Sequence, residues 1–577
     1  MSGALTMRAD PPHECVFRTE RLAKRALVRE HEKVNMRPIS NLLALLLASC
    51  LAPGIVGCGG TEPTKTPAAP PPIADDQGKA TNLTCPGMPG CENATGDFMV
   101  GAASKTISPA IETWTDTNAN GDWDDGEPYD DVNKNGKWDG VWLAGFGMGR
   151  AATGVHDDAW ARAVTLEQGD VSIGMISLDV VGFFQQWIID IREAAAAAGL
   201  DFDHVLVSST HVHEMQDTVG QWGPNASTTG VNPAYMDYVI SQAVEALKEA
   251  KAAQKKSKMV VAQAQRPELV NDTRPPIVVD QNINTIQFQD DSSAPIANVV
   301  IWGNHPEALG SKNQLLTSDY PHYLREAFEA KWPSAPAIFF SGPLGGLTTT
   351  IGITGCPDAG GMETCPQGTF ERAEYVGKGA GDAAIAALEG PNVTKDDAPA
   401  LAFRRRAFLI PPTNVTLALG VLSGLIVRDV YWADGRKVAD EERPGISVSL
   451  ISSGEVVVAT EVNGIQIGPV AIAGVPGEMY TELWLEKPGG GSYIEKPEGR
   501  DFPNDEPETP IQAMLPAGSI KMIINCANDF LGYIVPRTQW DFVEPWTYGE
   551  QQYGEENSAG DQTAPIIESE FAKMYGK

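Results

Sequence analysis

Two of the chain's eight histidines, His211 and His213, are separated by one residue in the stretch HVLVSSTHVHEMQDT, residues 204–218. Val205 to Val207 are typical of a buried strand, and alternate side chains of a strand point to the same face. We therefore expect both imidazoles to point the same way from the end of this strand, a position that suits metal ligands and acid–base groups. For the pair alone, the alternative interpretation is a hydrogen-bonded strand end without a chemical role.

Further candidates follow other predicted elements. His305 ends the strand-like run ANVVIWGNH and precedes a proline, and Tyr533 follows a turn in NDFLGYIVP. Glu478 lies in VAIAGVPGEMYTELW, where we expect a strand, a turn and then the first turn of a helix, whose dipole favours a carboxylate. A catalytic zinc takes three or four such ligands and keeps one position open. Each residue also has a structural explanation, as a capping glutamate, a core tyrosine or a histidine bound by the backbone.

The elements that must position these residues alternate between strand and helix patterns. Strands are predicted at 171–182, 205–210 and 297–307, and helices at 186–200 and 232–254. Beyond Leu401 strands dominate, including the alternating segment 446–477. This order predicts an α/β fold of mixed β-sheets flanked by helices, in one large catalytic domain over residues 97–577.

Composition limits the class of partner. The chain has 577 residues and a formal net charge of -32, which argues against nucleic acid or an anionic lipid surface as partner. No stretch is long and apolar enough to cross a membrane as a mature helix. Nothing in the sequence points to an obligate protein partner.

The N-terminal region is typical of targeting. MRPISNLLALLLASCLAPGIVGCGG, beginning at Met36, resembles a bacterial lipoprotein signal, with Cys58 as the predicted lipidation site and Cys50 as the alternative. We expect residues 1–58 to be the targeting region, with the true start at Met36, and residues 59–96 to be a linker rich in Pro, Thr and Ala. The protein is then exported and lipid-anchored to a bacterial membrane, in the periplasm or at the cell surface; an ordinary cleaved signal would release it.

An acidic insertion at 116–140 matches the calcium-loop template, with a glycine at position six. A second copy begins at Asp131 and includes Asn133, Asn135 and Asp139, but it lacks the terminal glutamate. We expect structural Ca²⁺ here, and a solvated acidic loop is the alternative. The predicted calcium ligands are Asp116, Asn118, Asn120, Asp122, Glu127 and Asp131.

The cysteines are sparse, as suits a few local disulfides in an exported protein. Cys85 with Cys91, and Cys356 with Cys365, are close enough in sequence to close small loops. Cys526 lies in an apolar run and is predicted to be a buried free thiol.

The order of these motifs resembles the neutral (non-lysosomal) ceramidase family over residues 97–560: His-x-His, a strand ending in NHP, PGE, then GY and QQYGEENSAG. The resemblance implies a zinc amidase that cleaves the N-acyl bond of ceramide, giving a sphingoid base and a fatty acid through zinc-activated water. The implied zinc ligands are His211, His305, Glu478 and Tyr533. The implied catalytic residues are His213 as acid–base group or oxyanion stabiliser, Arg274, Tyr553, and Thr348 at the family's serine position.

Three departures bear on the substrate. EMQDTVGQWGP replaces the glycine-rich run that follows the family's histidines, and LGGLTTTIG replaces its Gly-Asp-Val-Ser-Pro. We also expect no C-terminal immunoglobulin-like domain. A zinc hydrolase of another N-acyl amide or ester therefore stays open, as does a non-catalytic calcium-binding surface lipoprotein. No Gly-x-Ser-x-Gly elbow supports a serine hydrolase.

Overall fold

The computed structural model describes residues 82–577 except 354–355 and 357–365. Within these residues the strands form three larger sheets and three two-stranded ones. The first sheet has the order β1-β16-β18-β19-β21, with β17 on β18; the second β13-β11-β10-β8-β15; the third β6-β5-β4-β2-β7. The strands of the first sheet are β1 Asn82–Cys85, β16 Leu401–Ile410, β17 Tyr431–Trp432, β18 Val456–Ile467, β19 Val470–Gly474 and β21 Ile520–Ile524. Those of the second sheet are β8 Lys258–Gln265, β10 Asn282–Gln289, β11 Pro295–Trp302, β13 Ala337–Ser341 and β15 Thr394–Asp396. Those of the third sheet are β2 Met99–Thr106, β4 Trp160–Gln168, β5 Val171–Leu178, β6 His204–Ser209 and β7 Lys255–Lys256.

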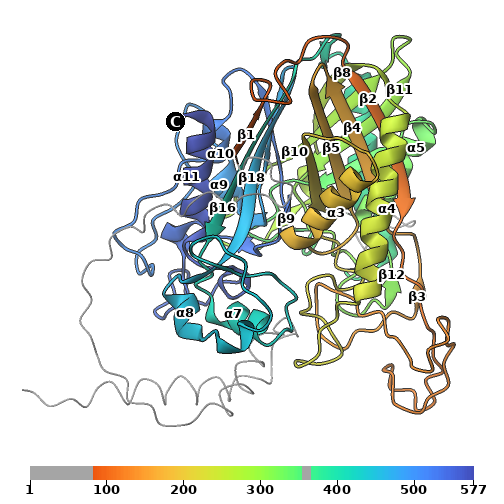
Figure 1. Cartoon of the computed structure of the whole chain (residues 1–577), viewed down its shortest axis with the longest axis vertical. Helices are drawn as coiled ribbons and strands as arrows, with labels where there is room; N and C mark the ends of the chain where they lie inside the picture. Colours follow the sequence, from red (N-terminus) through yellow and green to blue (C-terminus); the bar gives the residue numbers. More distant parts are fainter. Residues whose placement is uncertain (1–81, 354–355, 357–365) are drawn as a thin grey trace, which may run out of the picture. The chain divides into compact units, whose positions relative to one another are not determined.

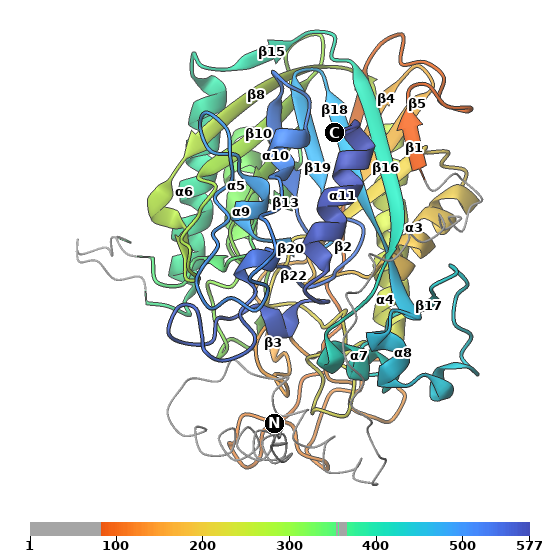
Figure 2. The same cartoon turned by 90° about the vertical axis from the view of Figure 1, so that its left-hand side faces the viewer.

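Helices cover one face of each sheet (Figures 1 and 2). α3 (Gln185–Ala197) and α4 (Pro233–Ala252) pack on the third sheet, and α5 (Tyr320–Lys331) and α6 (Phe370–Glu389) on the second. α11 (Thr563–Tyr575), with the short α9 (Thr481–Trp484) and α10 (Ile511–Met514), covers the first. Apolar side chains from all three sheets share one buried core, because each sheet turns its other face inward.

Each sheet contains a parallel pair of strands, and three edge strands of the sheets meet. The parallel pairs are β5 with β6, β11 with β13, and β19 with β21. Ser341, at the end of β13, donates from its hydroxyl to the carbonyl of Thr210 after β6, at 2.7 Å. Ser208 of β6 donates to the carbonyl of Asn525 after β21, at 2.9 Å. The carboxyl ends of β6, β13 and β21 are therefore held together at one place.

The fold confirms the predicted α/β class, and the described residues lie in one compact unit. The predicted strands and helices before residue 310 are present. One prediction is wrong: ISVSLIS alternates like a strand, but Val448–Ser452 form the short helix α8, with Ile451 packed in a small core beside β18.

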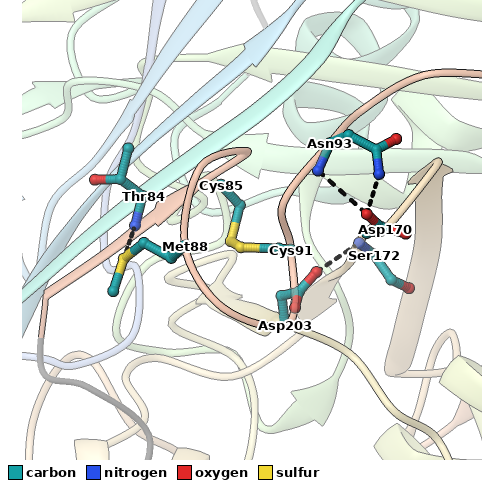
Figure 3. Close-up of a disulfide and its surroundings, with 8 residues drawn as sticks. All are labelled: Thr84, Cys85, Met88, Cys91, Asn93, Asp170, Ser172 and Asp203. Atoms are coloured by element: carbon teal, nitrogen blue, oxygen red, sulfur yellow. Dashed lines mark hydrogen bonds between the residues drawn. A yellow bond between two sulfur atoms is a disulfide. The ribbon is translucent and has the colours of Figure 1, made fainter.

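The predicted linker ends earlier than expected. Leu83 and its neighbours form β1, which pairs antiparallel with β16, so residues 82–96 belong to the folded unit. A disulfide joins Cys85 to Cys91, as predicted. The same loop is held to the turn between β4 and β5, where Asp170 accepts from the backbone N–H of Asn93 at 3.2 Å (Figure 3). These contacts explain why the segment is ordered despite its composition.

The predictions for the N-terminal region and for the cysteines can be compared with the structure only where those residues are described. Cys526 is a buried free thiol, as predicted. The targeting region, Met36, Cys58 and the first part of the linker lie outside the described residues, as does Cys365. Among the described helices, none combines the length and the apolar character needed to cross a membrane.

Candidate metal centre

Four side chains that the sequence nominates as zinc ligands converge in the described structure. The Nε2 atoms of His211 and His305 each lie 3.3 Å from Oε2 of Glu478, and the hydroxyl of Tyr533 lies 3.4 Å from Nε2 of His305. All four side chains are buried. They come from all three larger sheets: His211 follows β6, His305 follows β11, and Glu478 and Tyr533 follow β19 and β21.

The spacing of these donor atoms fits a small divalent metal. Zinc binds nitrogen and oxygen at about 2.0–2.2 Å, so neighbouring ligand atoms around a tetrahedral ion are about 3.3 Å apart. The three contacts between these donor atoms, two to Glu478 and one from Tyr533 to His305, measure 3.3 to 3.4 Å. Three histidines, His211, His213 and His305, place one ring nitrogen each within 4.8 Å of one another and could hold a metal ion.

His211 reaches the centre through an unusual backbone conformation. β6 ends at Ser209, so the histidines lie beyond the strand, and simple strand alternation does not orient them. His211 has a φ of 65°, which is uncommon for a residue with a side chain. Its backbone N–H donates to the carbonyl of Val180, and its Nδ1 lies 2.7 Å from the carbonyl of Val181. The surrounding structure thus fixes a strained residue, as is common at functional sites.

His305 and Glu478 are held by short strand pairings. The backbone N–H of His305 donates to the carbonyl of Thr348 at 2.9 Å, and its Nδ1 lies 2.8 Å from the same oxygen. Glu478 belongs to β20 (Glu478–Met479), which pairs in parallel with β22 (Tyr533–Ile534). The expected placement of Glu478 in the first turn of a helix is therefore wrong, because α9 begins only at Thr481.

Burial and neighbouring imidazoles set the charges of the centre. Burial disfavours a charged Glu478, but contacts with His211 and His305 outweigh it and hold its pKa at about 2. Burial, with the nearby His211 and His305, lowers the pKa of His213 well below its usual value. At neutral pH the centre therefore combines a carboxylate with an uncharged His213, and both forms suit metal binding.

His213 lies within the cluster rather than beside it. Its Nε2 is 3.2 Å from Nε2 of His211. Phe146 contacts its ring edge-on, with ring centroids 5.1 Å apart. A Cβ atom on Gly145, which has a φ of 94°, would lie 2.3 Å from the His213 ring, so only glycine allows this close approach.

Arg274 is buried behind the centre and does not point a free guanidinium at it. Its two terminal nitrogens lie 2.7 and 2.8 Å from the carboxylate of Glu555, and they also contact the carbonyls of Tyr553 and Gln539. These contacts give no support to the implied catalytic role of Arg274. They make it a positioning residue for Tyr553, whose ring centroid lies 5.7 Å from that of Tyr533.

Thr348 contacts the centre through its backbone. Its carbonyl receives the two contacts from His305, whereas its hydroxyl donates to the carbonyl of Pro343 at 3.3 Å. The predicted role as a catalytic hydroxyl thus gains no support from this contact. Asp179, at the end of β5, holds Arg325 through two contacts of 2.9 and 3.0 Å.

The acidic insertion forms two loops with the same internal contacts. In the first, the side-chain amides of Asn118 and Asn120 lie 2.7 and 2.8 Å from Oδ2 of Asp124. In the second, Asn133 and Asn135 contact Asp139 in the same way, at 2.6 Å each. The backbone N–H of Gly121 donates to Asp116, and that of Gly136 donates to Asp131. Asp124 receives the side-chain amides of the first loop but is not among the predicted calcium ligands. Asp122, which is among them, donates its backbone N–H to Asn120.

A buried glutamate closes each loop. Glu127 accepts from the backbone N–H groups of Thr117 and Asp124, at 2.7 and 3.1 Å. In the second loop Glu112 accepts from the corresponding N–H groups of Val132 and Asp139, at 3.0 and 2.8 Å. The second loop therefore has a closing carboxylate after all, supplied from the residues before the first loop. No sequence template could have found it, because the template expects this residue at the other end.

Sequence reasoning also missed Glu307, Thr349 and Val181 around the histidines. Val181 acts through its carbonyl, which carries no sequence signal. Glu307 had one usable signal, since it is a carboxylate two residues after a candidate ligand, in NHPE. Its oxygen Oε2 lies 3.5 Å from Nδ1 of His213, and Thr349 donates to its other oxygen.

Comparison with known proteins identifies the architecture. No protein-family model and no curated protein sequence matches the chain. Among solved structures, the neutral ceramidase from Pseudomonas aeruginosa is similar with a TM-score of 0.57 and 13% sequence identity, over 83% of this chain and 74% of that one. A ceramidase complexed with C2 gives a TM-score of 0.56 and 13% identity, over 83% and 75% of the two chains. The chain therefore has the fold of the neutral ceramidases.

Proposed function

We propose that this protein is a zinc-dependent amidohydrolase that cleaves the N-acyl amide bond of ceramide or a closely related lipid. The observation that carries the proposal is the convergence of His211, His305, Glu478 and Tyr533 at the spacing of metal ligands. The shared fold with two ceramidases supports the choice of reaction.

Zinc held by these residues would supply a Lewis acid for the amide carbonyl and the attacking water. The protein supplies positioning and proton control around it. Burial raises the pKa of Tyr553, so its hydroxyl keeps its proton at neutral pH and can donate a hydrogen bond to a developing oxyanion. Arg274 and Tyr480 both donate to the carbonyl of Tyr553, which fixes the position of that residue.

A lipid-like substrate is supported by exposed apolar side chains on two loops. Ile277, Phe542 and Val543 are 63%, 49% and 61% exposed. Ile277 follows Arg274 closely, and the backbone N–H of Asp541, next to Phe542, donates to Glu555. Both loops therefore start at the Arg274–Glu555 ion pair that also holds Tyr553. Exposed apolar residues of this kind suit contact with acyl chains.

We also propose that both acidic loops bind Ca²⁺ and stabilise the insertion. The supporting observation is that each loop has the same oxygen-rich contacts and a buried closing glutamate, Glu127 or Glu112. We further propose that the N-terminal signal leads to export and that Cys58 carries the lipid anchor.

The first experiment measures metal content and ceramide cleavage together, on the purified chain and on a His211→Ala, His305→Ala double variant. We expect about one zinc per wild-type chain, lost in the variant along with release of fatty acid. Zinc without ceramide cleavage would keep the amidase chemistry and move the search to other N-acyl compounds or esters. A wild type without zinc, even after reconstitution, would favour the non-catalytic lipoprotein.

A further inference from the structure

Arg150 is a buried arginine close to the metal centre that has no part in the proposed function so far. It is 7% exposed. Its Nη1 lies 2.9 Å from Oε2 of Glu214, the residue directly after His213, and Glu214 is fully buried. The side-chain amide of Asn313 donates to the same oxygen at 2.9 Å. A buried ion pair keeps its geometry when further hydrogen bonds satisfy it, so the position of the guanidinium is fixed.

The other nitrogen of the guanidinium holds two segments of backbone together. Nη2 of Arg150 donates to the carbonyl of His213 and to the carbonyl of Ala144. Hydrogen bonds from a charged donor are stronger than those between neutral groups. The backbone N–H of His213 donates to the carbonyl of Pro306 at 3.1 Å. Both polar backbone groups of His213 are therefore held, and Arg150 holds the carbonyl.

Arg150 also supports the aromatic ring that contacts His213. Its guanidinium carbon lies 5.0 Å from the centroid of the Phe146 ring, which is within the range of a cation–π contact. The Phe146 ring in turn meets the His213 ring edge-on, with centroids 5.1 Å apart. Arg150 thus acts on His213 in two ways, directly through its backbone carbonyl and indirectly through Phe146.

These contacts need an arginine and not merely a positive charge. A guanidinium is planar and carries five N–H donors in a fixed geometry, so it can bond a carboxylate and two carbonyls while its face lies on a ring. A lysine has all its donors on one nitrogen atom. It could keep the ion pair with Glu214, but it could not also join the carbonyls of His213 and Ala144 and pack on Phe146.

We infer that Arg150 is a positioning residue for the hydrolysis, and that it acts by holding His213 in place beside the metal centre. The inference rests on the proposed function, because it needs the reaction to which His213 contributes. The hydrogen bonds and the ion pair of Arg150 in the described part of the chain go to none of the four proposed zinc ligands. Zinc binding should therefore not depend on Arg150.

Arg150→Lys tests the inference through the kinetics of ceramide cleavage. We expect kcat to fall by about 100-fold, the loss that a small misplacement of a catalytic group can cause, with KM and zinc content unchanged. Arg162→Lys is the matched control, because Arg162 is equally buried and also contacts a glutamate, a carbonyl and an aromatic ring, those of Glu329, Ala337 and Trp160. It should keep the kcat of the wild type.

A double variant separates positioning from a general structural effect. In a His213→Ala background, Arg150→Lys should lower kcat no further, because the imidazole through which it acts is already gone. An equal fall in kcat with and without His213 would overturn the inference. If Arg150→Lys does not fold, Arg150→Met combined with Glu214→Met replaces it, since this pair of changes leaves no unpaired buried charge.

NMR of the zinc-free chain with carbon-13 in its histidine rings gives a measurement that needs no activity. The signal that is missing from His213→Ala identifies His213. It should shift in Arg150→Lys, because the edge contact with Phe146 changes the local ring current, and should stay in place in Arg162→Lys. An unshifted signal would overturn the inference. A wild type that binds no zinc or cleaves no N-acyl compound would overturn the proposed function, and the NMR signal would still decide whether Arg150 positions His213.

Discussion

Glu478 and Tyr533 are direct partners across the parallel pair β20–β22, so one backbone pairing sets the relative position of two proposed ligands. The backbone N–H of Glu478 also donates to the carbonyl of Gly532 at 2.9 Å. Main-chain hydrogen bonds tolerate side-chain replacement, since they do not involve the side chains. Either side chain can therefore be changed with the backbone left in place.

Glu478→Gln tests the role of charge in the centre. With a pKa of about 2, Glu478 is ionised at neutral pH, and glutamine keeps its shape but removes the charge. We expect zinc affinity to fall by more than about 100-fold, beyond the effect usual for an orienting partner. Chelator competition measures it, and Tyr533→Phe in the same assay gives the contribution of the hydroxyl. Zinc affinity within a factor of two of the wild type in both variants would contradict the proposed ligand set.

The sequence predicts the elements around the centre better than the contacts within it. The strand before His211 and the helix over 232–254 follow from local periodicity, which survives in any fold that buries those faces. β20 could not be predicted, because its two residues form a strand only by pairing with Tyr533, far along the chain. The sequence of α8 predicts a strand, because alternating apolar residues over so short a segment fit both a strand and a helix.

In the candidate site, too, residues that follow a predicted element could be nominated from the sequence, and residues that act through tertiary contacts could not. His211, His305, Glu478 and Tyr533 were found because each follows a recognisable element. Residues that act through tertiary contacts were not: Glu307 meets His213, and Glu112 closes a loop that begins at Asp131. Arg274 is among the residues that the sequence nominates, but its buried ion pair with the distant Glu555 carries no local sequence signal.

Glu508 should make the stability of the fold depend on pH. Burial raises its pKa to about 7, and its Oε2 is buried without a hydrogen-bond partner. An acid with a raised pKa in the folded state favours folding while it is protonated. The stability it contributes is complete below its unfolded pKa of about 4.5 and is lost as pH rises to about 7.

Glu508→Gln should remove this loss. We expect the free energy of unfolding, measured by urea titration between pH 4.5 and 7.5, to fall less with rising pH in the variant than in the wild type. Glu193→Gln, at an exposed position of α3, is the control and should keep the wild-type slope. Parallel slopes for Glu508→Gln and wild type would show that Glu508 is already ionised in the fold.

Calcium removal should destabilise the insertion in two separable steps. We expect two Ca²⁺ per chain by titration calorimetry, one in each loop. Glu127→Gln should abolish the first site and Glu112→Gln the second, because each glutamate closes a different loop. At a free Ca²⁺ concentration of 100 times the dissociation constant, each bound ion adds about 2.7 kcal/mol to the free energy of unfolding. Since the wild type then loses two ions and each variant only one, EGTA should lower the melting temperature of the wild type more than that of either variant. One ion in the wild type, lost only in Glu127→Gln, would exclude the second site.

Phe542 and Val543 should matter for ceramide in a bilayer and not for a soluble substrate. They are exposed, apolar and adjacent, on a loop anchored at Glu555. Replacing both with serine removes apolar surface from the loop without touching the buried ion pair. Fatty acid release from ceramide in zwitterionic vesicles should fall by up to about 100-fold, since both side chains are about half exposed and burying that exposed surface in lipid favours binding by up to about 3 kcal/mol, with about 1.4 kcal/mol for each factor of ten. Cleavage of a short-chain, monomeric ceramide should stay unchanged, because Tyr553 and the metal centre are intact.

Val132→Ser, at another exposed valine on the acidic insertion, is the matched control. Equal losses on both substrates would place these residues in the substrate pocket instead, and equal activities would remove them from lipid contact altogether.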